Sequence, residues 1–481
     1  MTFAAHPPDF WRQPEDAEQQ GRLLASADSA YRVEWLLQHG VNLNALDQDG
    51  NTALHNLLGA YSLSADQAAF VARLLRARPK LDIRNAEGKT PLYLALEQQH
   101  QEQAMALLAA GADPNLADKE GVTPLVFAVR HNDKALLQAL LDKGAAVNLQ
   151  DKSGQNPLFA LVDSGTATDL IDLLIAAGVD LKITDKQGQG ILQALAESRS
   201  KDEALPRLRK LLEQGLSPKV SNARRETPLH LAVISNAPKT AALLLDYQAD
   251  PNAQDAEGAT PLHYAVRIHS FRLLDALLKH HADPGKLNYY GKSPLHLAVE
   301  QGNQGMVEAL LAAQASVNTQ DRDLRTPLIS AVANNHTEIA LLLLEHDALV
   351  HVASKGGWQA LHFAVSQGNT ALIRALLARG ADPGAKLWNG SSAMDLLAKL
   401  DEKVRTPLQP LLTQGNTAPV SHDSAAPPLH QALGARDVSR VKQLLQQGAD
   451  PATLDRFGRS ALEKALIVAY QDTDRAQAML K

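Results

Sequence analysis

The chain has 481 residues and a net charge of −6, from 47 basic and 53 acidic side chains, and it contains no cysteine. This length exceeds what one hydrophobic core normally organises, so we expect several domains or a repeat array. The lack of cysteine excludes disulfides and thiol nucleophiles, and an acidic balance without a long basic run disfavours a nucleic-acid partner.

The N-terminal segment, residues 1–20, is predicted to be an extension ahead of the folded part. Residues 1–21 lack the cationic start and apolar run that are typical of a secretory signal. No apolar stretch reaches the roughly 18 residues that a membrane-spanning helix needs. We therefore expect no membrane span and a cytoplasmic protein. A periplasmic location is the alternative if a leader peptide has been removed.

From residue 21 onward the sequence repeats itself. The clearest copies are 88–111 (GKTPLYLALEQQHQEQAMALLAAG), 258–281 (GATPLHYAVRIHSFRLLDALLKHH) and 291–314 (GKSPLHLAVEQGNQGMVEALLAAQ). The slot that holds Thr in T-P-L-H is occupied by Thr52, Thr90, Thr123, Asn156, Gly190, Thr227, Thr260, Ser293, Thr326, Gln359, Ser392, Pro427 and Ser460. Eight of the twelve successive intervals are 33 residues, so one structural unit recurs in phase.

Each repeat predicts two short helices and a projecting hairpin. Thr in the first slot can accept a backbone N–H bond at a helix start, and Pro in the next slot suits the first helical turn. Leu and Ala then recur at spacings of three and four residues, which gives one buried stripe. A second Leu- and Ala-rich helix follows, ended by a glycine such as Gly111 or Gly144. Because one unit is too small to bury its own apolar face, neighbouring units must stack.

The period and the T-P-L-H-x-A signature resemble the ankyrin-repeat family. Residues 227–232 (TPLHLA) and 260–265 (TPLHYA) match that signature fully, and residues 293–298 (SPLHLA) match with Ser for Thr. The resemblance extends over about residues 20–475 and implies an all-α fold, a curved solenoid of about fourteen helix-turn-helix units joined by hairpin-like loops. It also implies that the histidine of this slot bonds to backbone and to the neighbouring unit.

The repeat pattern breaks at several places. The array is predicted to span residues 21–415, with a weak joint near 188–226, where Gly190 replaces the capping Thr, Ser198–Pro206 is inserted and Arg225 takes the place of the turn glycine. Residues 416–428 are predicted to be a Pro-rich seam, and residues 429–481 the final repeats with a C-terminal cap. These breaks indicate either functional spots or drift in a redundant repeat.

No motif for catalysis or metal binding stands out. The chain lacks H-E-x-x-H, G-x-S-x-G and a glycine-rich dinucleotide fingerprint. The segments 88–90 and 291–293 imitate the end of a phosphate-binding loop but lack its first glycine at the required spacing. We therefore expect no enzymatic activity, no cofactor and no metal.

A partner surface is predicted at the hairpin tips and on the concave face of the first helices, where partners of ankyrin-like arrays usually bind. Aromatic and arginine side chains, which dominate interface hot spots, gather at the predicted tips of adjacent units. The candidate tip residues are Tyr289, Tyr290, Arg322, Arg325, Trp358 and Trp388, and the candidate first-helix residues are Arg267 and Glu300. The alternative is that these aromatic side chains fold back onto their own hairpins.

These observations predict a protein–protein binding module that acts as a scaffold, an adaptor or an inhibitor and is monomeric on its own. One alternative is a bacterial immunity protein that neutralises a toxic enzyme by occlusion. Another is a host-directed effector or regulator. The fold alone does not choose among them, because fold never fixes the target.

Overall fold

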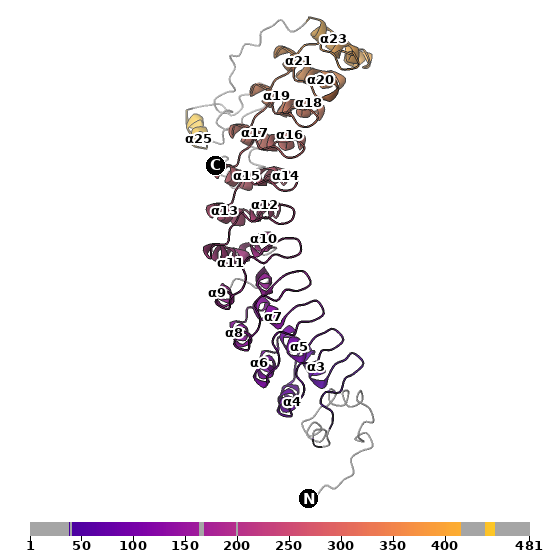
Figure 1. The fold of residues 1–481 in the computed structure, drawn as a ribbon. Coiled ribbons are helices and arrows are strands. Elements are labelled where there is room, and N and C mark those ends of the chain that lie inside the picture. Colours follow the sequence, from indigo (N-terminus) through magenta and orange to yellow (C-terminus); the bar gives the residue numbers. More distant parts are fainter. Residues whose placement is uncertain (1–37, 39–40, 163–167, 199–200, 415–437, 448–481) are drawn as a thin grey trace. The chain divides into compact units, whose positions relative to one another are not determined.

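The computed structural model describes residue 38 and residues 41–162, 168–198, 201–414 and 438–447 (Figure 1). These residues form helices and no strand, with two isolated β-bridges at Thr184–Gly190 and Lys386–Ser392. None of the helices in these ranges is long and apolar enough to cross a membrane. The predicted all-α repeat fold is confirmed, whereas the count of about fourteen units stays a prediction.

The chain divides into two compact units, Met1–Ala223 and Arg224–Lys481. In the first unit, the first helices of successive repeats contact one another, and the second helices do the same, so the unit has two helix rows (Figure 1). Its pairs are α3 (Ala53–Leu58) with α4 (Ala65–Arg76), α5 (Pro91–Glu97) with α6 (Gln101–Ala110), α7 (Pro124–Arg130) with α8 (Lys134–Asp142), η2 (Pro157–Val162) with α9 (Asp169–Ala176), and α10 (Ile191–Glu197) with α11 (Lys201–Glu213).

The second unit repeats this plan. Its pairs are α12 (Pro228–Ile234) with α13 (Pro238–Asp246), α14 (Pro261–Arg267) with α15 (Phe271–Lys279), α16 (Pro294–Glu300) with α17 (Gln304–Ala312), α18 (Pro327–Ala333) with α19 (Thr337–Glu345), α20 (Ala360–Ser366) with α21 (Thr370–Ala378), and α22 (Ala393–Leu397) with α23 (Glu402–Gln414). A short helix, η3 (Lys355–Gly357), lies in one hairpin, and α25 (Val438–Gln446) is the last described element. The predicted seam at 416–428 lies outside the described residues, as does most of 429–481.

The first helices begin as the sequence predicts. The side chains of Thr90, Thr227 and Ser293 each accept a bond from a backbone N–H in the first turn, and Pro follows each of them. Thr123 makes no such bond. In the repeat that starts at Asn156, the first helix is a 3-10 helix instead of an α-helix, and the Asn156 carbonyl accepts from the backbone N–H three residues later.

The predicted joint near 188–226 contains the boundary between the two units, which falls after Ala223. The insertion predicted at Ser198–Pro206 is mostly helical, because residues from Lys201 onward belong to α11, with Pro206 inside that helix. Arg207 of the same helix is fully buried, and its guanidinium donates to the Leu161 carbonyl. The mechanical weakness of the joint stays a prediction.

The hairpins are held together by backbone bonds. In most of the described hairpins, a carboxylate or amide oxygen accepts two backbone N–H groups, as Asp255 does from Glu257 at 2.8 Å and from Ala259 at 2.9 Å. Each tip then donates one backbone N–H to a carbonyl of the tip before it, so that Tyr289 bonds to Glu257 at 2.8 Å and Trp388 to Gly356 at 3.0 Å. Within each unit these bonds join the tips into a row that is independent of side-chain identity.

Turn glycines let adjacent hairpins approach closely. Gly258 has a φ of +73°, and a Cβ placed on it would lie 2.6 Å from Cδ1 and 2.9 Å from the backbone nitrogen of Tyr289. Gly390, in the last described hairpin, has a φ of +82° but open space around it. Both glycines therefore have a left-handed backbone, which disfavours other residues. A side chain would clash with a neighbouring residue at Gly258 but not at Gly390.

We expect Gly258→Ala to lower the free energy of unfolding more than Gly390→Ala does. Both variants carry the cost of a left-handed non-glycine residue, about 1–2 kcal/mol, and only Gly258→Ala adds a clash with Tyr289. Urea unfolding of the full chain measures the difference. Equal losses for the two variants would show that Tyr289 moves aside without cost.

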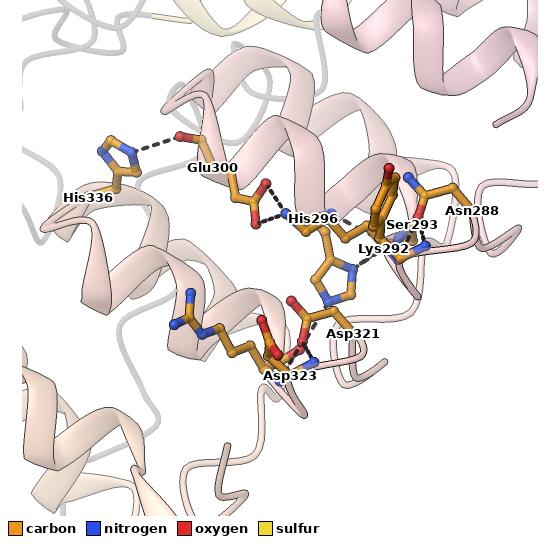
Figure 2. A network of polar contacts seen from close by, with 10 residues as sticks. Asn288, Lys292, Ser293, His296, Glu300, Asp321, Asp323 and His336 are labelled. Carbon is orange, nitrogen blue, oxygen red and sulfur yellow. Dashed lines mark hydrogen bonds and ion pairs between the residues drawn. The ribbon is translucent and has the colours of Figure 1, made fainter. Parts of the chain in front are cut away.

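Buried histidines connect consecutive repeats (Figure 2). In the Ser293 repeat, Nδ1 of His296 accepts the Ser293 backbone N–H at 3.2 Å, and Nε2 donates to the carbonyl of Arg325 in the next hairpin at 3.2 Å. His263 makes the same pair of bonds with Thr260 and Lys292. A backbone N–H can only donate and a carbonyl can only accept, so each ring is neutral and carries its proton on Nε2. A proton on Nδ1 would face the backbone N–H that this nitrogen accepts.

Burial lowers the pKa of His263 to about 4, and it lowers the pKa of His230 and of His296 as well. The ordinary value is about 6.5, so between these pH values the folded chain binds fewer protons than the unfolded chain. The stability that these neutral histidines contribute is therefore fully present above about pH 6.5, and it is lost as the pH falls toward 4.

We expect the urea midpoint of the full chain to fall steadily between pH 7 and pH 4.5. His263 alone accounts for a loss of about 3 kcal/mol once the pH is below its folded pKa of about 4, and most of that loss already falls within this range. The variant His263→Ile introduces the residue that the chain itself has at Ile329, in the same slot two repeats later. It should be less stable at pH 7 and should show a shallower fall. A midpoint that does not change with pH would mean that these buried rings are not held neutral by the fold.

Candidate functional site

The hairpin tips of the second unit carry most of the predicted site residues. We define the tip row as residues 224–226, 256–258, 289–292, 322–325, 355–358 and 388–391. In the first unit, the corresponding positions hold small or charged residues, among them Asp49, Glu87, Lys119, Glu120 and Lys152. The tip row differs because it combines aromatic side chains with arginines.

Two tyrosines lie near the middle of the tip row. Tyr289 is 47% exposed and Tyr290 is 57% exposed. The Tyr289 ring lies against the turn of Gly258, and its hydroxyl accepts a bond from the Arg225 guanidinium at 3.1 Å. Tyr289 is therefore held in one position while half of its surface remains open to solvent.

Arg322 and Arg325 lie in the next hairpin, and both are exposed. Neither guanidinium forms a hydrogen bond or ion pair with a residue that the structure describes. Between them, Asp323 pairs with Lys355 at 2.9 Å, and this lysine holds the pKa of the Asp323 carboxyl below its ordinary value. Asp323 is thus already engaged in an ion pair, and the two arginines form none among the described residues.

The structure separates the two candidate tryptophans. Trp388 is 78% exposed at its tip. Trp358 is half-buried, with its ring centre 4.7 Å from that of Phe363 and 6.2 Å from that of His362. Trp358 therefore takes the alternative arrangement, in which the aromatic ring folds back onto its own repeat, and Trp388 presents its ring to solvent.

The two first-helix candidates have different neighbours, because Arg267 lines a cavity with Tyr290 and Glu300 pairs with a tip lysine. Arg267 holds its guanidinium 4.2 Å from the ring centre of Tyr264, and Glu300 pairs with Lys292 at 2.8 Å (Figure 2). Tyr264 donates to the Asp255 carboxylate at 2.5 Å, and burial together with this bond raises its pKa, so it stays protonated. A cavity of about 190 Å³ is lined by Glu257, Ala259, His263, Tyr264, Arg267, Asn288, Tyr290, Lys292 and Leu297.

The cavity brings together Tyr290 of the tip row and Arg267 of α14, two residues that the sequence predicted separately. Tyr289, Arg322, Arg325 and Trp388 do not line it, so the candidate site is a row of exposed groups with one small recess beside it. Sequence reasoning did not propose Leu324 as a site residue. The sequence feature that could have identified Leu324 is the presence of a bulky residue in the slot that usually holds the turn glycine.

The part of the chain that the structure describes has no group of three or more His, Cys, Asp or Glu residues placed to hold a metal ion. The buried histidines face backbone partners, as described above, which uses both ring nitrogens. What this surface offers chemically is contact area, arginine donors and aromatic faces.

We expect Trp388→Ala to change the free energy of unfolding by less than about 0.5 kcal/mol, because its ring is mostly exposed. Trp358→Ala should lower it by about 1–2 kcal/mol, because the ring packs on Phe363. Chemical denaturation of the two single variants provides the comparison. A loss for Trp388→Ala as large as that for Trp358→Ala would mean that the exposed ring supports the fold.

Both the family profile and the solved structures that match this chain consist of ankyrin repeats. The sequence profile described as "Ankyrin repeats (3 copies)" matches residues 23–118, 57–151, 103–183, 158–255, 247–321 and 314–386. The solved ankyrin repeat domains of Bcl-3 and of human ASB11 are 35% and 29% identical, with TM-scores of 0.42 and 0.39. They cover 47% and 46% of this chain, which in turn covers 100% and 97% of them.

Two curated proteins are similar over shorter stretches. An intracellular phospholipase A2 from Caenorhabditis elegans is 40% identical over 80 residues, which is 16% of this chain and 7% of that protein. A probable serine/threonine-protein kinase from Dictyostelium discoideum is 35% identical over 82 residues, 17% of this chain and 10% of that protein. The chain thus spans a tenth or less of the length of these relatives.

Proposed function

Because the chain belongs to the ankyrin-repeat family, whose repeats are protein–protein interaction modules, we propose that it is a non-enzymatic binding protein that uses the tip row of its second unit as the main contact surface. One observation carries the proposal. Tyr289, Tyr290 and Trp388 are exposed on a backbone that is fixed by hydrogen bonds from tip to tip.

Physical reasons support this choice of surface. Tyr, Trp and Arg supply most of the binding energy in protein interfaces, because each buries a large area at small entropic cost. The tip row places such residues on adjacent hairpins whose backbone is already ordered, so little conformational entropy is lost on binding. The first unit has the same backbone without these side chains, which argues that its tips serve the fold more than recognition.

Recognition without catalysis fits an inhibitor, an adaptor or a scaffold. We propose that the chain acts as a monomer and binds its partner in a one-to-one complex, because one continuous row of tips in the second unit forms a single surface. Stoichiometry in solution tests this part. Light scattering of the purified chain should give the mass of one chain, and the complex should add one partner; a dimer of the free chain would contradict it.

The test of the proposed function uses three forms of the full chain as bait in source-cell lysate. These are the natural chain, the triple variant Tyr289→Ser, Tyr290→Ser and Trp388→Ser, and a matched first-unit variant with Lys119→Ser, Glu120→Ser and Lys152→Ser. Quantitative mass spectrometry compares the captured proteins. We expect one protein to be retained by the natural chain and by the first-unit variant and to be lost from the tip-row variant.

The purified partner should then bind the tip-row variant at least about a hundredfold more weakly than the natural chain, since removing two or three hot-spot side chains costs several kcal/mol. Circular dichroism and urea unfolding serve as controls for the fold. If the partner binds the tip-row variant unchanged, or if the first-unit variant loses it instead, the proposal is wrong.

A further inference from the structure

Resting on the proposed function, we propose that the tip row recognises an extended acidic segment of another protein, in which two acidic positions about nine residues apart meet Arg225 and Arg322 and apolar side chains contact Tyr290 and Trp388. The partner is identified by charge, by backbone strain at the tips and by the spacing of the repeats.

The charge of the tip row is opposite to that of the chain. The chain carries a net charge of −6, whereas the tip row holds six basic and three acidic side chains. The basic residues are Arg224, Arg225, Lys292, Arg322, Arg325 and Lys355, and the acidic ones are Glu226, Glu257 and Asp323.

Ion pairs within the structure show which basic side chains of the tip row are already neutralised. Lys292 is paired with Glu300, and Lys355 is paired with Asp323. Both lysines are therefore compensated, and the remaining excess of positive charge consists of arginines. Arg322 and Arg325 are exposed and form no ion pair with a described residue. Arginine binds carboxylates through two parallel hydrogen bonds, so acidic side chains are the matching ligands.

Two hairpins hold a bulky residue where others have the turn glycine. Arg225 and Leu324 both have a φ of 59°, in the left-handed region that disfavours residues with a Cβ. Leu324 is also 44% exposed, so burial does not compensate for its strained backbone. Unfavourable backbone conformations of this kind gather at binding sites, where the side chain serves a purpose other than stability. The two residues lie on either side of the Tyr289 hairpin along the tip row.

The spacing of the repeats sets the register of a bound segment. Packed helices lie about 8–10 Å apart, so successive tips recur at about that distance. An extended chain advances about 3.3 Å per residue, so about three partner residues span one repeat. Arg225 and Arg322 lie three hairpins apart, so two acidic side chains about nine residues apart would meet them, and the residues between would pass Glu257 and Tyr290. A helical segment advances only about 1.5 Å per residue and would not keep this register.

A nucleic acid is the other polyanion that arginines could attract. It is disfavoured because the net charge of −6 repels a dense polyanion at long range, and because Glu226, Glu257 and Asp323 interrupt the row. A peptide with spaced carboxylates avoids these acids, whereas a continuous phosphate backbone does not.

The experiment selects ligands without assuming a partner. A phage-displayed library of random peptides, each about twelve residues long, is panned against the immobilised full chain. We expect enriched sequences to contain two acidic positions about nine residues apart together with Leu, Phe or Trp. Enrichment of neutral or basic peptides, or acidic peptides without this spacing, would overturn the proposal, as would the recovery of no binding sequence.

Synthetic versions of the enriched peptides then test the site by fluorescence anisotropy. The double variant Arg322→Glu and Arg325→Glu should weaken binding at least about tenfold, and the matched first-unit variant Lys119→Glu and Lys186→Glu should not change it. Equal effects of the two double variants would overturn the assignment to the tip row. Tighter binding of a random single-stranded DNA of about twenty nucleotides would assign the surface to nucleic acid instead.

The two proposals fail in different ways. If a protein captured from lysate depends on Tyr289, Tyr290 and Trp388 but is unaffected by the reversal of Arg322 and Arg325, the proposed function stands and the acidic partner is wrong. If neither set of substitutions affects any captured protein, the proposed function itself fails.

Discussion

No helix pair that the structure describes buries its apolar residues by itself. Leu262, Ala265 and Val266 of α14 are fully buried because neighbouring pairs cover them, and the same holds along both units. Stability in such an array is close to a sum of the terms for each repeat and for each interface between neighbours. A change in one hairpin is therefore felt mainly by the repeat that follows it, as the contact between Gly258 and Tyr289 illustrates.

Among these interfaces, the one made through a buried histidine depends on the protonation state of the ring. It connects the start of one first helix to the carbonyl that ends the next hairpin, and it does so only while Nδ1 is unprotonated. The repeat that begins at Thr326 has Ile329 in the same slot and dispenses with this bond, and its helix starts with the Thr326 side chain alone. The array thus combines pH-sensitive and pH-insensitive interfaces within one unit.

The helices, their caps and the histidine slot could be predicted from sequence, because each depends on local chemistry that recurs in phase. The structure differs from the sequence prediction where the position of a side chain depends on contacts with a neighbouring segment. Trp358 directly precedes the helix-start slot, so its ring reaches Phe363 of its own helix, whereas Trp388 is the first residue of its tip and its ring lies beside Gly357 of the preceding hairpin. The recess beside Tyr290 depends on three segments from adjacent repeats, and no single repeat contains that information.

A hydrogen bond between main-chain atoms joins each described tip to the next within its unit. Side chains at these positions are therefore free to change without disturbing the stack, apart from the glycine on which a neighbour rests. In an evolving lineage, this architecture keeps specificity separate from foldability. One repeat can acquire a tyrosine pair and another a pair of lysines, and recognition can shift along the array by substitution alone, without insertions or a new scaffold.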